Sequence, residues 1–240
     1  IRGDNPFLSA DLRTSLQNAG LPLTSATSFV LGRMGDDFGY TDNRNQSDVM
    51  RVLVGLSGSL GAGWNWDVSV QYGRTQYDQE VGNNRVQQQV LGVTNVTGQP
   101  TRIQLAADAT IDTNGQPICR STLTNPGNGC VPVNLFGVNN WSAAARDYLY
   151  ADGWLKQEFT QKALAANLQG DLFSTWAGPV PLAVGVEYRD NDSSTTADPI
   201  SASSGFYVFN SSVVSGGIEV TEGYAETVVP LAADLPFAKS

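Results

Sequence analysis

The stretch Gly63–Gly73 reads GWNWDVSVQYG and alternates between two kinds of side chain at every step. Its even-numbered positions carry Trp, Trp, Val, Val and Tyr, whereas its odd-numbered positions carry only polar residues and glycine. Successive side chains of a β-strand point to opposite faces, so the stretch predicts a strand with one apolar face and one polar face. A strand of this kind lies between an apolar medium and a wet one.

The preceding residues predict a second strand that pairs with this one. Residues 50–57 alternate in the same sense, and Leu53 is the one large apolar residue at an odd position. Between the two strands lies GSLGAG, residues 58–63, whose glycines can adopt the positive φ of a tight reversal. We therefore expect an antiparallel hairpin with both apolar faces on the same side.

The same pattern returns later in the chain. Residues 163–172 and 182–189 alternate on either side of the turn sequence FSTWAGP and predict a second hairpin. Residues 218–229 predict one more strand, in which Glu222 and Glu226 are assigned to the polar side. These strands indicate an all-β fold built as an antiparallel meander.

The predicted connections are of two kinds. Hairpins over about residues 46–80 and 158–190 have short turns of about six to nine residues, whereas the loops over about 81–157 and 190–216 are long, and a last strand covers about 216–231. Structureless loops of this size are unusual in compact soluble domains. Short turns at one rim, long loops at the other and aromatic residues near the lipid boundary are typical of outer-membrane barrels.

Three tryptophans fit this interpretation, because Trp64, Trp66 and Trp176 all fall beside the short turns. The pattern therefore favours part of a transmembrane outer-membrane β-barrel with long extracellular loops that contain short helical pieces. The alternative is a soluble all-β protein that binds or acts on carbohydrate, since the core of a β-sandwich needs the same alternation.

The N-terminal stretch predicts a short helix. In residues 3–20, Asp4 or Asn5 can cap a helix, Pro6 suits its first turn and Gly20 can end it. A disordered terminus is the alternative.

Composition excludes several classes of function. The 240 residues carry a formal net charge of -9, so the surface repels phosphate backbones and nucleic-acid binding is not expected. The chain has no histidine, the commonest general base and zinc ligand. Glu222 and Glu226 stand about 13 Å apart along a strand, farther than the carboxylate pair of a glycosidase. We therefore expect neither an enzyme nor a bound cofactor or metal.

The two cysteines predict a disulfide. Cys119 and Cys130 are too far apart in sequence for a redox pair and have no companions for a zinc site. A bridge between them would close a loop rich in Asn, Pro and Gly; two unpaired buried thiols are the alternative.

Six stretches in the same order carry a resemblance to a known family: NPFLSADLR (5–13), GLSGSLGAGWNWDVSVQYGRT (55–75), CRSTLTNPGNGCVPVNLFG (119–137), EFTQKALAANLQGDLFSTWAGPVPLAVGVEYR (158–189), ADPIS (197–201) and EGYAETVVPLAADLPFAKS (222–240). Together they resemble the TonB-dependent receptors of Gram-negative outer membranes, in the large-barrel branch common in alphaproteobacteria. The likeness is spread over almost the whole chain.

This resemblance implies a location and a task. Members of the family place a plug domain inside a 22-stranded barrel and use TonB to drive the import of scarce ligands such as siderophores, haem, cobalamin or oligosaccharides. Residues 1–240 then correspond to an internal segment of the barrel wall without the plug. The expected partners are outer-membrane lipid, the TonB system through the missing plug, and an imported small ligand.

Two sets of residues are candidates for ligand handling in such a receptor. The polar faces of the strands would face the barrel lumen, and the residues assigned there are Arg51, Asp67, Gln71, Asn167, Gln169, Glu187 and Arg189. The aromatic residues of the long loop could stack on a ligand, and these are Trp141, Tyr148, Tyr150 and Trp154. Alternatively, the polar set only bonds within a wet lumen, and the aromatic set only forms a small core of the loop.

Overall fold

The computed structural model of the chain describes residues 1–87 and 99–233, apart from the side chain of Asp36. The chain forms two compact units. The first unit comprises Ile1–Asn45, Gln79–Leu155 and Ala197–Val213, and the second comprises Gln46–Asp78, Lys156–Thr196 and Val214–Ser240.

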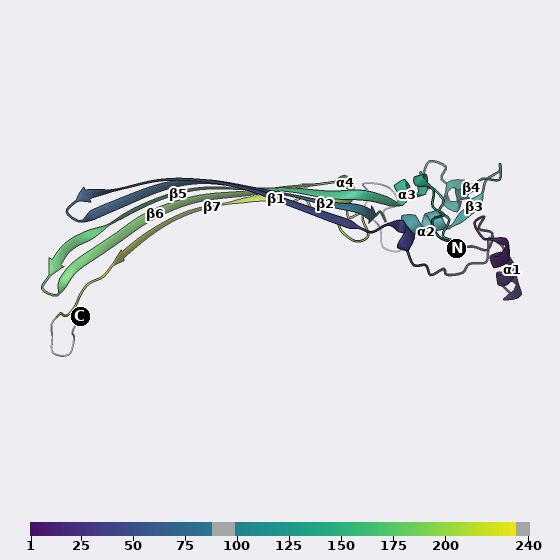
Figure 1. The fold of residues 1–240 in the computed structure, drawn as a ribbon, viewed down its shortest axis with the longest axis horizontal. Helices are drawn as coiled ribbons and strands as arrows, with labels where there is room; N and C mark the ends of the chain where they lie inside the picture. Colours follow the sequence, from purple (N-terminus) through teal and green to yellow (C-terminus); the bar gives the residue numbers. More distant parts are fainter. Residues whose placement is uncertain (88–98, 234–240) are drawn as a thin grey trace. The chain divides into compact units, whose positions relative to one another are not determined.

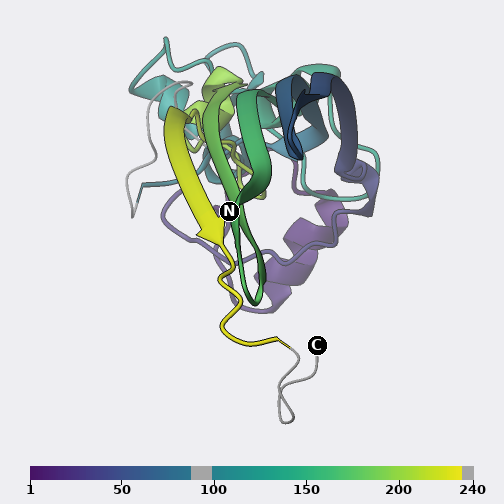
Figure 2. The same ribbon diagram turned by 90° about the vertical axis from the view of Figure 1, so that its left-hand side faces the viewer.

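Five long strands form one sheet and account for most of the fold, which confirms the all-β prediction at the level of fold class. They are β1 (Asp42–Gly61), β2 (Trp64–Arg85), β5 (Tyr150–Thr175), β6 (Gly178–Ala197) and β7 (Ser215–Thr227). Their order in the sheet is their order in the sequence, as expected for a meander. They lie side by side in one layer (Figures 1 and 2), and β1 and β7 are the two edges.

The turns within the two hairpins are tighter than the sequence predicted. Strands β1 and β2 are separated only by Ala62 and Gly63, and β5 and β6 only by Trp176 and Ala177. Gly61, Ala62 and Gly63 all have positive φ, between 49° and 84°. Because these residues complete the reversal by themselves, the flanking residues stay in the strands, and the expected turns of about six to nine residues were too long.

The long loops are also shorter than predicted. Strand β2 continues to Arg85 and β5 begins at Tyr150, so their connection is residues 86–149. Strand β6 ends at Ala197 and β7 covers Ser215–Thr227, which leaves residues 198–214 as the second loop. Polar residues continue the strand pairing where the sequence pattern indicated loop.

The first loop contains small elements of its own. Its helices are α2 (Arg102–Ala107), the 3-10 turn η2 (Arg120–Leu123) and α3 (Ala143–Leu149), and the strands β3 (Ala109–Ile111) and β4 (Pro117–Cys119) form a separate two-stranded sheet. The second loop contains α4 (Pro199–Ala202). Short helical pieces in the long loops were expected.

The N-terminal helix begins later than the sequence suggested. Helix α1 spans Ala10–Asn18, and the hydroxyl of Ser9 accepts a hydrogen bond from the backbone N–H of Leu12. Asn5 is not the cap, because its side chain donates to the carbonyl of Ala107, 2.9 Å away, and binds this segment to the loop. A 3-10 turn, η1 (Asp36–Phe38), precedes β1.

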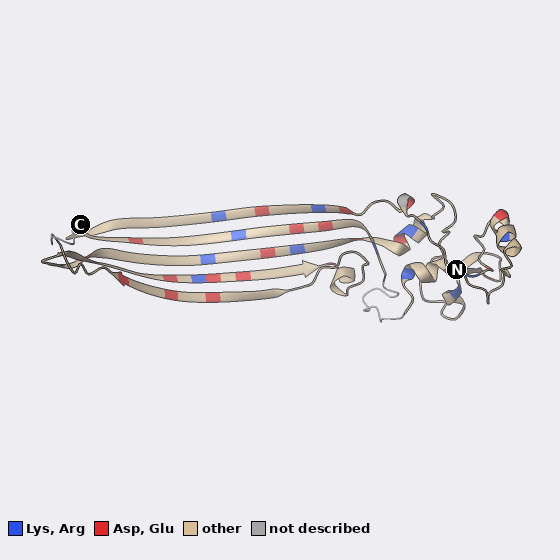
Figure 3. Cartoon of the chain, turned by 90° about the horizontal axis from the view of Figure 1, so that it is seen from below, with Lys and Arg blue, Asp and Glu red and all other residues tan. Residues whose placement is uncertain are grey.

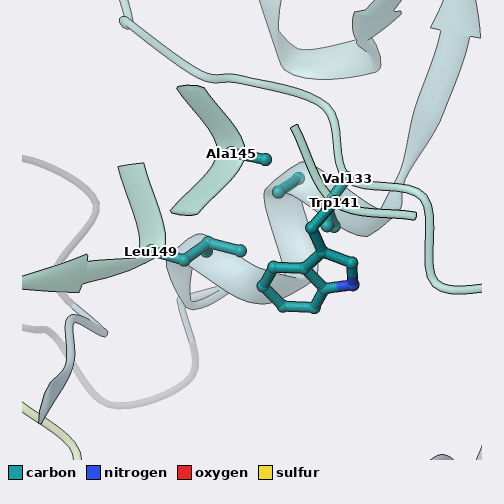
Figure 4. Packing of buried hydrophobic residues seen from close by; sticks show 5 residues of the cluster. Val133, Trp141, Ala145 and Leu149 are labelled. Atoms are coloured by element: carbon teal, nitrogen blue, oxygen red, sulfur yellow. The ribbon is translucent and has the colours of Figure 1, made fainter. Parts of the chain in front are cut away.

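The first unit has a small apolar core. It comprises Ala106, Val133, Trp141, Ala145 and Leu149, which come from α2, from α3 and from the chain between them (Figure 4). Phe38, which precedes β1, and Tyr150, the first residue of β5, pack against this cluster. Among the helices that the structure describes, none has the length and apolarity to cross a membrane.

Candidate functional site

The polar face of the second unit is crossed by a series of side-chain hydrogen bonds. Arg51 of β1 donates to Gln71 of β2, whose amide donates to Gln161 of β5 over 2.7 Å. Gln161 in turn donates to Asn191 of β6 over 2.9 Å. The series therefore connects four neighbouring strands on the face to which the sequence pattern assigned Arg51 and Gln71.

A second series runs parallel to the first and reaches the edge strand β7. Asn167 of β5 donates to the carboxylate of Asp67 on β2 over 2.8 Å, and Tyr224 of β7 donates to Asn167 over 3.1 Å. Tyr224 crosses β6 at Gly185, where an added Cβ would overlap both the Tyr224 ring and the Asn167 amide. A glycine at this position is thus required for the contact.

The remaining residues predicted for this face also lie on it. Glu187 and Arg189 follow Gly185 in alternation on β6 and form an ion pair with 3.6 Å between Oε1 and Nε. Gln169 lies two residues beyond Asn167 on β5. All seven residues assigned to the lumen therefore share one face of the sheet.

The pairing of β6 with β7 shows on which face of the sheet the glutamates of β7 lie. Glu222 lies opposite Glu187, and Glu226 lies opposite Ala183, so both glutamates are on the polar face as predicted. The register also brings two carboxylates, Glu187 and Glu222, directly opposite each other. Spacing along a single strand could not reveal this pair, because it depends on how two strands align.

The other face of the second unit is apolar and uncovered. Val54, Leu56, Val70, Leu164 and Val186 are between 47% and 68% exposed, although all of them are large apolar residues. No layer of the described residues in this unit packs over them. An open apolar face of this extent calls for a partner or an apolar medium.

Aromatic side chains lie at both ends of the apolar stretch on β2. Near the hairpin turn, Trp64 lies over Gly170 of β5 and Trp66 lies over Gly58 of β1, so closely that a Cβ on either glycine would meet the indole ring at 2.5–3.0 Å. At the far end of the stretch lies Tyr72. The sequence pattern identified the tryptophans but did not single out the tyrosine as a second boundary.

Beyond Tyr72 the same face becomes charged. Arg74 forms an ion pair with Glu158 over 2.5 Å, and Lys162 forms one with Asp190 over 3.3 Å. Charged residues are sparse on the strand ends next to the two-residue turns (Figure 3). Sequence reasoning missed these pairs, although the alternation past Tyr72 already turns polar and could have shown where the apolar stretch ends.

Three of the four loop aromatics proposed as ligand contacts pack within the first unit. Trp141 is 9% exposed, and its ring centroid lies 4.0 Å from that of Phe38 and 6.2 Å from that of Tyr150. Tyr148 lies beneath the guanidinium of Arg102, which is 4.8 Å from its ring centroid. This packing is the small loop core that the sequence left open as the alternative.

The fourth loop aromatic, Trp154, lies apart from this core in β5. Its side chain is 37% exposed, and its backbone N–H donates to the carboxylate of Asp198 over 3.0 Å. Asp198 also caps α4 by accepting from the backbone N–H groups of Ile200 and Ser201. Of the four candidates, Trp154 thus remains the most accessible to a ligand.

Asp37 is the best-connected carboxylate beside the core. It accepts from the Arg33 guanidinium and from the backbone N–H of Asn139, each over 2.6 Å. Desolvation acts to raise the pKa of Asp37, but these two hydrogen bonds outweigh it and hold the pKa below its usual value. Arg33 also lies over the Phe38 ring, 4.5 Å from its centroid, so one cation joins the carboxylate to the aromatic cluster.

The predicted disulfide is present between Cys119 and Cys130. Within the loop that it closes, the side chain of Asn128 accepts from the backbone N–H of Cys130 and donates to the hydroxyl of Ser121. Arg120, next to the bridge, forms ion pairs with Asp4 and with Asp108. The bridge therefore stabilises the part of the first unit onto which the N-terminal segment docks.

Within residues 1–87 and 99–233, no three His, Cys, Asp or Glu side chains are grouped closely enough to hold a metal ion. No protein-family model, curated protein or solved structure matches this chain. The case for a function therefore depends on the two faces of the sheet and on the loop unit.

Proposed function

We propose that the chain forms part of the wall and the extracellular loops of an outer-membrane receptor that imports a scarce ligand. The apolar face of β1, β2, β5 and β6 contacts lipid, and the polar face lines the lumen. The resemblance of the sequence to TonB-dependent receptors supports this type of importer. The chain itself transforms no substrate, and energy reaches the receptor through TonB and a plug domain.

The observation that carries the proposal is the uncovered apolar face with its boundaries. From Trp64 to Tyr72 the strand advances about 27 Å at about 3.4 Å per residue. Strands of outer-membrane barrels tilt by about 35–45°, so the stretch spans about 20 Å along the membrane normal. This is close to the apolar band of these barrels, which is about 25 Å tall and has aromatic residues at both interfaces. The ion pairs Arg74–Glu158 and Lys162–Asp190 then lie beyond the band, where water and lipid headgroups are available.

The polar face fits a lumen because its side chains satisfy one another across the strands. Backbone groups on the edges β1 and β7 cannot stay unpaired in lipid, since each unsatisfied group there costs several kcal/mol. We therefore expect further strands of the same receptor to pair with both edges. A 22-stranded barrel of the family type would supply them.

Neighbouring positions on β2 offer a direct test. Single cysteines replace Val70 and Gln71 in the receptor expressed in a Gram-negative outer membrane, and each carries a nitroxide spin label. The label at Val70 should collide with oxygen, which concentrates in lipid, and the label at Gln71 with a water-soluble nickel complex. The native cysteines do not interfere, because they form the Cys119–Cys130 disulfide.

The comparison is internally matched, because the two positions are adjacent and differ only in the face they occupy. Equal access of both labels to the nickel complex would reject the membrane assignment. It would favour a soluble protein whose apolar face is covered by another protein layer.

A further inference from the structure

The first unit contains a cavity of about 600 Å³ whose wall is partly the loop closed by the disulfide. This volume lies within the range of small-molecule sites. Helix α2, the disulfide loop and helix α3 all contribute to its lining. The side chains that matter for recognition are Arg102, Leu105, Asn125, Asn128, Asp147 and Tyr148.

Two of these residues form a rigid cation and ring pair. Arg102 is 7% exposed, donates to the backbone carbonyl of Tyr148 over 2.7 Å and lies over the Tyr148 ring. The hydroxyl of Tyr148 is buried and has no hydrogen-bond partner among the described residues. Because this oxygen has almost no accessible surface, it does not face the cavity, and Tyr148 contributes to the lining through its other atoms.

The loop closed by the disulfide contributes side-chain amides and glycine backbone to the cavity wall. Asn128 is held by its bonds to Ser121 and Cys130, and Thr124 donates to the carbonyl of Ser121 over 3.2 Å. Gly129 has positive φ, and an added Cβ there would have no neighbour within 4 Å. The loop is thus shaped by its own hydrogen bonds and leaves space on its cavity side.

The exposed charge of the lining is negative. Asp147 of α3 is exposed, and its carboxylate has no hydrogen bond or ion pair within the part of the chain that the structure describes. The guanidinium of Arg102 is buried against Tyr148, and the protein as a whole carries a net charge of -9. An anionic ligand would therefore gain little here, whereas hydroxyl groups could bond to the carboxylate and the amides together.

We propose that this cavity binds a neutral, polyhydroxylated ligand of the size of a mono- or disaccharide. Asp147 accepts hydrogen bonds from its hydroxyl groups, and the Asn125 amide accepts from them and donates to them. The aliphatic face of the sugar ring contacts Leu105 and the Tyr148 ring. The inference rests on the proposed function only where it identifies the bound saccharide as the imported ligand.

The test measures binding of maltose, cellobiose and sucrose to the detergent-solubilised chain by saturation-transfer NMR and calorimetry, with citrate and inorganic phosphate as anionic probes. At least one saccharide should bind, and Asp147→Asn should weaken it by about tenfold or more, which corresponds to about 1.4 kcal/mol. Asn125→Ala should also weaken binding with little change in the melting temperature, because its side-chain amide has no hydrogen bond within the part of the chain that the structure describes. Tyr150→Phe is the control, since Tyr150 packs on the apolar core and does not line the cavity.

The proposed saccharide site is supported if either cavity variant loses affinity while the Tyr150→Phe variant binds as the native chain does. Binding of the anions alone, binding of no saccharide, or equal affinity in all variants overturns it. These measurements need no membrane, so their outcome is independent of the outcome of the spin-label test. If the chain binds saccharide but Val70 is exposed to water, the saccharide site is supported and the proposed importer is rejected.

Discussion

Gly185 shows how a missing side chain organises the polar face of the sheet. Tyr224 is on β7 and Asn167 is on β5, so their hydrogen bond must pass over β6, and it does so at Gly185, which has no Cβ. Glu187 of β6 and Glu222 of β7 lie directly opposite each other, so two negative charges are adjacent on the same face of the sheet. Such a pair is unfavourable by itself, and the ion pair of Glu187 with Arg189 offsets part of that cost.

We predict that Gly185→Ala destabilises the sheet by about 1–3 kcal/mol, because the new methyl group displaces Tyr224 and breaks its bond to Asn167. The free energy of unfolding in detergent, measured by chemical denaturation, checks this. Gly216→Ala on β7 is the control, since a Cβ there would meet no atom within 4 Å. Equal stability of the two variants would contradict the proposed crossing.

Because of Asp37, we predict that the stability of the first unit depends on pH in the acid range. Its pKa is lowered on folding, so the ionised carboxylate adds stability that is fully present above the unfolded value of about 3.9. That stability is lost as the pH falls through the lower pKa of the folded state. Denaturation at neutral pH and at about pH 3, followed by near-UV circular dichroism, should show the loss.

The matched variant is Asp37→Asn, which removes the titrating group but keeps the size of the side chain. It should be less stable than the native chain at neutral pH and should differ less from it in acid. A constant difference between the two proteins across this pH range would mean that Asp37 contributes no such stability.

At the scale of the element, each hairpin strand combines a continuous apolar stretch with a polar continuation. Strand β2 is apolar on one face from Trp64 to Tyr72 and carries the Arg74–Glu158 ion pair just beyond. The glycines Gly58 and Gly170 provide flat positions on which Trp66 and Trp64 rest. An aromatic ring packed on a strand glycine protects the backbone there and helps to set the register.

On the proposed location in a membrane, arginine at Val70 should cost about 2–4 kcal/mol, because it places a charge near the bilayer midplane. Arginine at Gln71 should be nearly neutral, since that side chain belongs to the polar face. Urea unfolding of the receptor in lipid vesicles measures both. Equal costs at the two positions would mean that the faces are wrongly assigned.

The contribution of the disulfide to the stability of the first unit can be predicted. Cys119 and Cys130 are separated by 11 residues in sequence, and the chain-entropy model gives about 3 kcal/mol for a loop of that length. The double variant Cys119→Ser with Cys130→Ser should lower the stability of the first unit by about this amount. Hydrogen exchange should rise in residues 119–130 and stay unchanged in β2. Unaltered exchange in this loop would show that its own hydrogen bonds suffice.

At the scale of the whole molecule, the chain consists of two compact units. The second unit supplies a sheet with one apolar and one polar face, and the first supplies a packed loop structure with a core and a cavity. On the proposed function, the sheet provides the wall and the loop unit provides recognition. Loops tolerate change that strands do not, because less of the fold depends on them.

Removal of residues 86–149 and their replacement by a short Gly-rich linker should therefore abolish or alter ligand uptake while the receptor still inserts. The deletion stops at Arg85 and Tyr150, because the strands β2 and β5 extend to these residues. Heat-modifiable migration on gels reports the folded receptor, and growth on the imported ligand reports uptake. Full uptake without the loop would remove it from ligand recognition.

Several features follow from the sequence alone, because they depend on local geometry. The alternation in Gly63–Gly73 predicted a strand with two unlike faces, since side chains of any strand point alternately up and down. The glycines around Ala62 predicted the reversal, and the isolated cysteine pair predicted the disulfide. Each of these features needs only neighbouring residues or the absence of competing partners.

Other features were decided only by the tertiary structure, because they depend on how distant segments align. The Glu187–Glu222 pair and the Tyr224–Asn167 bond exist only in the observed register of the strands. The lengths of the strands and loops also escaped prediction, since polar residues pair in a sheet as well as apolar ones do. The burial of Trp141 depends on Phe38, about a hundred residues earlier in the chain, and no local pattern encodes that contact.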